Sequence, residues 1–147
     1  MAIMRFSGVD DIIAAFDVEA GRMDRNGDAA VEAGADVLIE AAREEAPVAT
    51  GVYHTGRRAG EKREAPANPG GLRDSVTKTH AERDERGDLS ATVYPDGLDP
   101  SGERYATIGS VLEYGRSDTP PNPWMERAGI KAEKGIDEAM QSELAKD

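Results

Sequence analysis

The segment that most restricts the fold of this chain is VLEYGRSDTPPNPWMERA, residues 111–128. An apolar run leads into the step Glu113-Tyr114-Gly115, then into a proline-rich elbow, and then into a helix that contains the single tryptophan, Trp124. Proline fixes its own φ, and glycine permits backbone conformations that other residues resist. The segment therefore predicts a stiff joint that holds one angle between the preceding element and the helix. We interpret this joint as architecture rather than as an active site.

The helix after the elbow has a favourable start, because Asn122 is placed to cap it and Pro123 to occupy its first position. Glu113 is a candidate for an ion pair with an arginine of this or a neighbouring subunit. Apolar residues then recur at three- and four-residue spacing, which predicts one buried helix face. They are Met125, Ala128, Ala132, Ile136, Met140 and Leu144.

Two helices are expected near the N-terminus. The first begins at a capping box, residues 7–10, and its apolar face comprises Ile12, Ile13, Phe16, Ala20 and Met23. The polar stretch DRNGD, residues 24–28, is expected to interrupt it. A second helix is predicted over residues 28–46 and ends before Pro47, because the residue preceding a proline is pushed out of the helical region.

Strands are expected in the second half of the chain. Residues 72–80 and 89–94 show period-two alternation with β-branched side chains, and the polar, glycine-containing link between them predicts a hairpin. Residues 105–113 are a third strand candidate. The order helix, helix, strands, helix predicts one α+β domain over residues 1–147, with a small antiparallel sheet packed against two to three helices.

Composition excludes several classes of protein. The 147 residues suffice for one ordinary core, no cysteine is present for disulfides or thiolate chemistry, and no apolar run is long enough to cross a membrane. The start of the chain lacks the pattern of a secretory signal, so a soluble protein made in a cytoplasm is expected. With 29 acidic and 18 basic residues the net charge is −11, which argues against a general DNA-phosphate binder. A solvated acidic surface, adaptation to a salt-rich cell, or an acidic channel wall that repels DNA would each explain this charge.

No metal or cofactor site is predicted. Asp24, Asn26 and Asp28 have the spacing that opens a calcium-binding loop, but Ala29 and Ala35 stand where that loop needs a glycine and a bidentate acid. A polar turn between two helices is the expected structure of this stretch.

No catalytic residue is predicted either. His54 and His80 lack partners at the spacing of metal ligands or of a general-base system, so surface positions are expected. Asp96 and Asp99 form the nearest approach to an acid pair. They lie in turn-rich sequence, whereas paired catalytic carboxylates need a rigid frame.

A long glycine- and proline-rich loop, residues 52–71, is expected to be a flexible arm. Four cations lie close together in it, and they are candidates for contact with phosphate or with an acidic partner: Arg57, Arg58, Lys62 and Arg63.

Three stretches in order carry a resemblance to a known family: AREEAPVATG (residues 42–51), GGLRDSV (residues 70–76) and YATIGSVLEYGRSDTPPNPWMERA (residues 105–128). Together they resemble the small tail-completion and head–tail joining proteins of long-tailed double-stranded DNA viruses. Two departures stand out: residues 52–71 intervene where the family usually passes directly from Thr-Gly to Leu-Arg, and Trp124 stands where the family commonly has phenylalanine. The residues that carry the resemblance, and that form the candidate assembly motif, are Pro47, Thr50, Gly51, Leu72, Arg73, Ser75, Tyr105, Glu113, Tyr114, Gly115, Pro123 and Trp124.

The resemblance implies a virion structural protein without enzymatic activity, cofactor or membrane contact. It implies a homo-oligomeric ring, a hexamer or dodecamer, at the neck or the head-proximal tail end. Such a ring would contact neck, tail-terminator or tail-tube proteins and would line the passage of the genome DNA. Two alternatives stay open: an adaptor or regulatory domain that binds a protein through the basic loop, and an enzyme built on an unrecognised carboxylate site.

Overall fold

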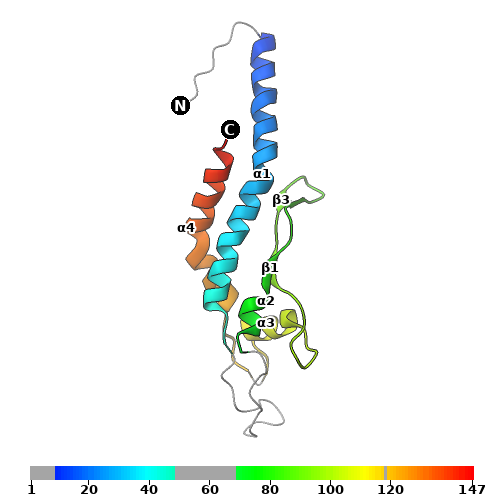
Figure 1. Ribbon diagram of the computed structural model, residues 1–147, viewed down its shortest axis with the longest axis vertical. Helices are drawn as coiled ribbons and strands as arrows, with labels where there is room; N and C mark the ends of the chain where they lie inside the picture. Colours follow the sequence, from blue (N-terminus) through cyan, green and yellow to red (C-terminus); the bar gives the residue numbers. More distant parts are fainter. Residues whose placement is uncertain (1–8, 49–68, 118) are drawn as a thin grey trace.

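A long antiparallel pair of helices forms the frame of the molecule (Figure 1). The structure is a computed structural model that describes residues 9–48, 69–117 and 119–147. Helix α1 (Val9–Glu45) is the longest element, and α4 (Trp124–Leu144) lies along its C-terminal half. Small residues allow close approach, since Gly34 of α1 lies under the side chains of Ile136 and Met140.

The predicted break at residues 24–28 is wrong, because α1 is continuous through this stretch. A single glycine inside a helix costs only about 1 kcal/mol, and tertiary contacts outweigh such a local preference. Here Arg83 of the hairpin lies 3.3 Å from Asp24, the Asn26 side-chain amide donates to the backbone oxygen of Lys146, and Leu89 packs at Gly27.

The predicted hairpin is confirmed. Strands β1 (Val76–Lys78) and β4 (Val93–Pro95) pair antiparallel, with Thr77 opposite Tyr94, and β2 (Glu82–Arg83) pairs antiparallel with β3 (Leu89–Ser90). The amide of Thr79 donates to the carbonyl of Thr92 at 2.9 Å and so links the two pairs into one ribbon. In the view of Figure 1 this ribbon and α4 flank α1, and residues of both line one groove along that helix.

Two predicted strand segments are helical. The strand predicted over residues 72–80 begins only at Val76, because Gly71–Ser75 forms the short helix α2, in which the Ser75 hydroxyl donates to the Leu72 carbonyl at 2.6 Å. The strand candidate at residues 105–113 is helix α3 (Tyr105–Tyr114). Its buried and half-buried residues include Tyr105, Ile108, Gly109 and Leu112, whose helical spacing of three and four is obscured in the sequence by the β-branched residues of this run.

Within the described residues these four helices and two small antiparallel sheets form one α+β domain, as predicted. The core lies at one end of the molecule, where the C-terminal half of α1, α2, β1 and the start of α4 meet. Trp124 and Val76 are its largest fully buried side chains. The predicted buried face of α4 is present too, with Ala128 and Ala132 exposed by only 0% and 4%.

Candidate assembly joint

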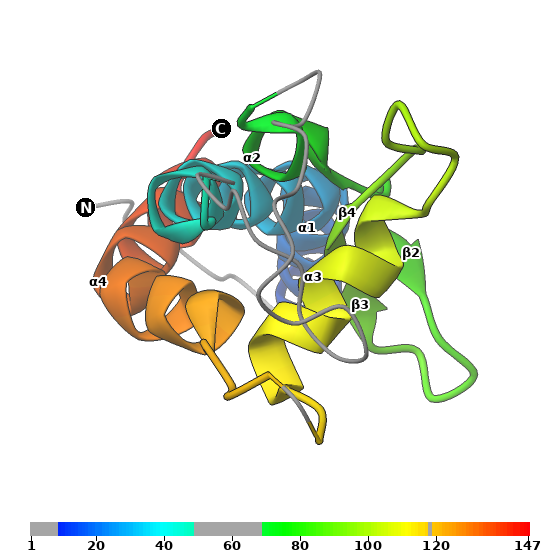
Figure 2. The same ribbon diagram turned by 90° about the horizontal axis from the view of Figure 1, so that it is seen from below.

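The stretches that carry the family resemblance meet at this end of the molecule. Figure 2, which views the molecule from below, shows α2, α3 and the start of α4 grouped around the C-terminal end of α1. Pro47 lies half-buried just past the end of α1. Thr50, Gly51 and all four cations of the basic loop, Arg57, Arg58, Lys62 and Arg63, lie outside the described residues, as does His54.

Trp124 anchors α4 to α3. Its side chain is fully buried, and its indole Nε1 donates to the backbone carbonyl of Gly109 at 3.1 Å. A Cβ on Gly109 would lie 3.1 Å from the indole ring and 3.2 Å from Pro95. Gly109 therefore permits the close approach of α3 to both α4 and the hairpin, and a buried Trp N–H finds the partner that it needs.

Glu113 caps α4 from the preceding helix. Its carboxylate oxygens accept from the backbone amides of Met125 at 2.8 Å and Glu126 at 3.1 Å. The first amides of a helix lack partners within the helix, and a negative charge there also interacts favourably with the helix dipole. The prediction that Asn122 caps α4 and that Pro123 is its first helical residue is therefore wrong. Pro123 occupies the N-cap position without a side-chain cap, and Glu113 takes the capping role.

Gly115 makes the turn between α3 and the elbow. Its φ of 71° lies in the region that favours glycine, as the sequence predicts, and a Cβ there would be 2.7 Å from the backbone oxygen of Thr119. The elbow then folds back on α3, where the amide of Asn122 donates to the carbonyl of Leu112 at 2.6 Å. Tyr114 beside it is 79% exposed.

The residues of the stretch GGLRDSV, residues 70–76, lie partly in the core and partly at the surface. Leu72 is buried in the core cluster, and Gly71 leaves room for Tyr105, whose hydroxyl would lie 2.1 Å from a Cβ at that position. Arg73 is exposed and pairs with Asp74 at 2.9 Å, which lowers the pKa of the Asp74 carboxyl below its usual range.

The other acidic residues that were considered as catalytic or metal-binding candidates have structural roles or are simply exposed. Asp99 organises its own turn: its carboxylate accepts from the Ser101 hydroxyl at 2.7 Å and from the amides of Ser101 and Glu103, and these bonds lower its pKa. Asp96 is exposed, and the backbone of Asp24, Asn26 and Asp28 is helical. Among the described residues there is no group of three or more His, Cys, Asp or Glu side chains that could hold a metal ion.

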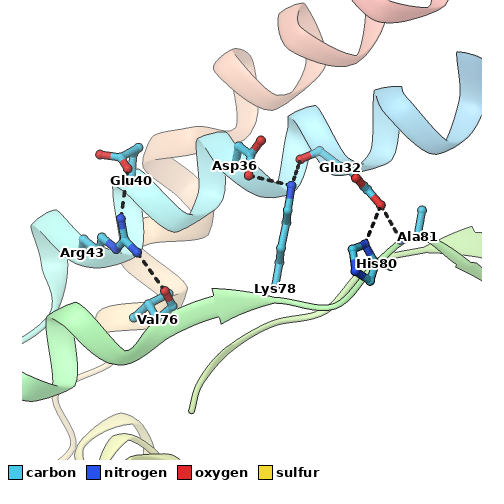
Figure 3. A network of polar contacts seen from close by, with 8 residues as sticks. All are labelled: Glu32, Asp36, Glu40, Arg43, Val76, Lys78, His80 and Ala81. Atoms are coloured by element: carbon cyan, nitrogen blue, oxygen red, sulfur yellow. Dashed lines mark hydrogen bonds and ion pairs between the residues drawn. The ribbon is translucent and has the colours of Figure 1, made fainter. Parts of the chain in front are cut away.

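Sequence reasoning missed a polar network that ties α1 to the hairpin (Figure 3). The Lys78 ammonium lies 2.7 Å from Asp36, and the Glu32 carboxylate accepts from the Ala81 amide at 3.1 Å, with the exposed His80 ring 3.4 Å away. The Ala81 hydrogen bond is the main cause of a lowered pKa of Glu32.

The same network continues toward the core, where the Arg43 guanidinium donates to the carbonyl of Val76 at 3.1 Å. In the sequence, this network is indicated only by the spacing of Glu32, Asp36, Glu40 and Arg43, which places them on one face of a helix. That signal shows a polar face, but it does not show what the face contacts.

The N-terminal half of α1 extends past both α4 and the hairpin (Figure 1). α4 ends beside Asn26 and Arg22, the latter 3.6 Å from Asp147. Beyond that point Ile13 and Phe16 are 53% and 69% exposed, although the sequence places them on an apolar helix face.

Comparisons with protein-family models, with curated proteins and with solved structures gave no match. Among the described residues, no helix has both the length and the apolar character needed to span a membrane.

Proposed function

We propose that this chain is a virion structural protein that forms a homo-oligomeric ring at the neck or the head-proximal tail end of a long-tailed double-stranded DNA virus. In this role it joins or completes the tail and takes part in no catalysis. The observation that supports the proposal is the joint itself. Residues from stretches that are distant in the sequence, Leu72, Glu113 and Trp124 among them, make one compact contact set at one end of the molecule.

The joint suits ring assembly for a geometric reason. A ring closes only if the same contact repeats at the same rotation from subunit to subunit, so the elements that carry the contact must keep fixed angles. Here α4 is fixed to α3 by a buried hydrogen bond from Trp124, by the carboxylate of Glu113, and by a glycine turn at Gly115 that has no room for a side chain.

The net charge of −11 also suits the proposed location. An acidic passage repels phosphates, so DNA would slide through without sticking. The partners are then other copies of this chain and the neighbouring neck, tail-terminator or tail-tube proteins, while the genome DNA passes through the lumen without sequence-specific binding.

Electron microscopy of virus particles made with and without the gene tests the proposal, with the wild-type gene supplied in trans as control. DNA-filled heads beside separate tails would support a joining role, and tails of irregular length would support tail completion. Normal, infectious particles in the absence of the gene would contradict both and would favour the adaptor that binds through residues 52–71.

A further inference from the structure

The strand that returns from the tip of the hairpin has an open outer edge. The amide of Thr79 donates to the carbonyl of Thr92, and the amide of Asp96 donates to the carbonyl of Ser75, each at 2.9 Å. In an antiparallel pair, the residues that alternate with such bonded positions turn their N–H and C=O groups away from the partner strand. The backbone of Val93 therefore points to the side of β4 that β1 does not occupy.

The same alternation continues toward the tip of the hairpin. The amide of Asp84 donates to the carbonyl of Asp88 at 2.9 Å, which places the backbone of the next residue, Leu89, on the outer edge as well. Ala91 lies between two positions that face the partner strand, so its backbone also points outward. Outward N–H and C=O groups thus recur at residues 89, 91 and 93, which is the spacing at which an added strand forms hydrogen bonds.

This edge borders an apolar groove of about 260 Å³. Val31 and Leu38 of α1 lie in the floor of the groove, and Ile136 and Met140 of α4 form the wall opposite the strand. A segment paired with the edge would therefore have apolar side chains beneath it and α4 on its other side. This surrounding suits an extended segment in which every second side chain is apolar.

The outer rim of the groove on α4 is acidic. Glu133 and Asp137 are exposed, and at the helical repeat they lie beside Ile136 and Met140, on the side away from the buried face of α4. A cation on the solvent side of an added segment would meet opposite charge there. The groove therefore favours an apolar strand that carries a positive charge on its outer face.

We propose that this edge binds residues 2–6 of a second copy of the chain, AIMRF, as an added β-strand. Residues 1–8 lie outside the described residues. Their sequence has the pattern that the groove requires, because Ala2, Met4 and Phe6 alternate with Ile3 and Arg5. In the added strand the first three side chains face the floor of the groove, and Arg5 faces the acidic rim.

The segment cannot reach the groove of its own chain. α1 begins at Val9, and the near end of the open edge, Leu89, packs at Gly27, about 27 Å further along the helix. Even fully extended, Ala2 lies at most about 25 Å from Val9, and Phe6 at most about 11 Å. The projecting half of α1 therefore carries this segment away from its own groove, and the occupant must come from another copy.

The inference deepens the proposed function by naming a contact for self-association, and it rests on that function only for the use of the ring in a virion. The segment and the groove are different surfaces of one chain, so each copy gives its segment to one neighbour and receives that of another. Such a contact repeats from copy to copy and produces a ring when the rotation closes. It also covers an edge strand that would otherwise be free to pair with other chains.

Met4 and Ile3 provide a matched pair for the first test, because neighbouring residues of a strand face opposite sides. Sedimentation equilibrium of the purified full chain compares wild type, Met4→Gln and Ile3→Gln, with circular dichroism as the check on folding. Molar KCl screens the repulsion between copies that each carry −11. We expect Met4→Gln to weaken self-association about 10-fold or more, because it places an amide in an apolar groove, and Ile3→Gln to leave it near wild type.

A mixing experiment tests the exchange between chains. Ala91→Pro removes an outward N–H and leaves the bonds within the hairpin in place, as Pro95 already does at another outward position of this strand. This variant has a blocked edge and an intact segment, whereas Met4→Gln has an intact edge and an impaired segment. Each should be monomeric alone, and an equimolar mixture should form a dimer with one copy of each and nothing larger.

Three results would overturn the inference. They are a wild-type chain that stays monomeric in molar KCl, equal effects of Met4→Gln and Ile3→Gln, and a mixture of the two folded variants that stays monomeric. The outcomes also separate this inference from the proposed function. Open chains of copies that depend on Met4 but never close would support the strand contact and contradict the ring, whereas rings that persist in Met4→Gln would contradict the contact and leave the ring intact.

Discussion

At the scale of single residues, the joint depends on a few side chains whose partners lie elsewhere in the chain. Glu113 is the clearest case, since the amides that it accepts from belong to Met125 and Glu126 in the next helix. Trp124 is another, because its hydrogen-bond acceptor is a backbone carbonyl of α3.

Removing the Glu113 carboxylate should destabilise the protein. We expect Glu113→Ala to lower the free energy of unfolding by about 1–2 kcal/mol, the range for lost helix caps, because two amides of α4 lose their acceptor. Glu113→Gln keeps one acceptor oxygen and should cost less. Urea unfolding followed by circular dichroism measures both, and equal losses for Ala and Gln would contradict the capping role.

Two glycine substitutions should have opposite effects. Gly115→Ala should destabilise by about 1–3 kcal/mol, because its positive φ is strained for alanine and the new Cβ would lie against the backbone of Thr119. Gly129→Ala should stabilise by about 0.4–1 kcal/mol, because it lies inside α4 with no atom within 4 Å of the new Cβ. Thermal unfolding of the two variants beside wild type checks the signs, and a harmless Gly115→Ala would refute the strained turn.

At the scale of elements, α1 is the axis of the molecule and three different contacts define its faces. α4 packs on one side, the hairpin is tied to another through Glu32, Asp36 and Arg43, and the apolar face between them forms the groove and its projecting extension.

The tie between α1 and the hairpin should make stability depend on acid pH. The pKa of Glu32 in the folded state lies below its usual value of 4.5, so the folded state binds fewer protons than the unfolded state near that pH. The stabilisation is therefore present above about 4.5 and is lost as pH falls through the lower folded value. Glu32→Gln should lose less stability than wild type between pH 5 and pH 3.

Unfolding midpoints across this pH range provide the measurement, with Glu133→Gln, an exposed acid of α4, as the matched control. That control should follow the wild-type curve. Parallel curves for wild type and Glu32→Gln would show that the Ala81 hydrogen bond does not couple folding to protonation of Glu32.

At the scale of the whole molecule, charge is the dominant property. The chain carries −11, and among the described residues no side chain that is polar or charged is buried. The acids of this part of the chain therefore lie at or near the surface, where they repel one another and where salt acts on them most strongly.

Stability should therefore rise with salt. We expect the unfolding midpoint of wild type to increase by several degrees from low salt to molar KCl, because screening removes self-repulsion from the folded state. Thermal scans in KCl and in equimolar KSCN separate screening from salting-out, since both salts screen but only chloride leaves apolar burial undiminished. A midpoint that does not respond to KCl would count against adaptation to a salt-rich cell.

Much of the fold follows from local patterns in the sequence. The stripe of Ala128 and Ala132 predicts the buried face of α4, alternation and a polar glycine turn predict the hairpin, and Gly115 takes the conformation that its place before the prolines indicates. These features depend on residues that are close together in the sequence. They can therefore be predicted without knowing where the segment lies in the fold.

The secondary-structure predictions are wrong where contacts between residues distant in the sequence are made. Residues 24–28 stay helical because Lys146, Arg83 and Leu89 hold them from both sides. Residues 105–114 form a helix in which Gly109 packs against Trp124 and accepts its indole hydrogen bond. Neither contact is visible in the local pattern.

The sequence alone determined the class of fold, the stiff elbow and the acidity, since propensity, proline and charge act locally or sum over the chain. Tertiary structure alone decided that Glu113 caps α4 and that the apolar face of α1 divides into a groove and an open stripe. The reason is that a hydrogen bond or a packing contact has its energy only when its partner is present. Those partners lie 12 or more residues away, as Met125 does from Glu113, or more than a hundred, as Met140 does from Gly34.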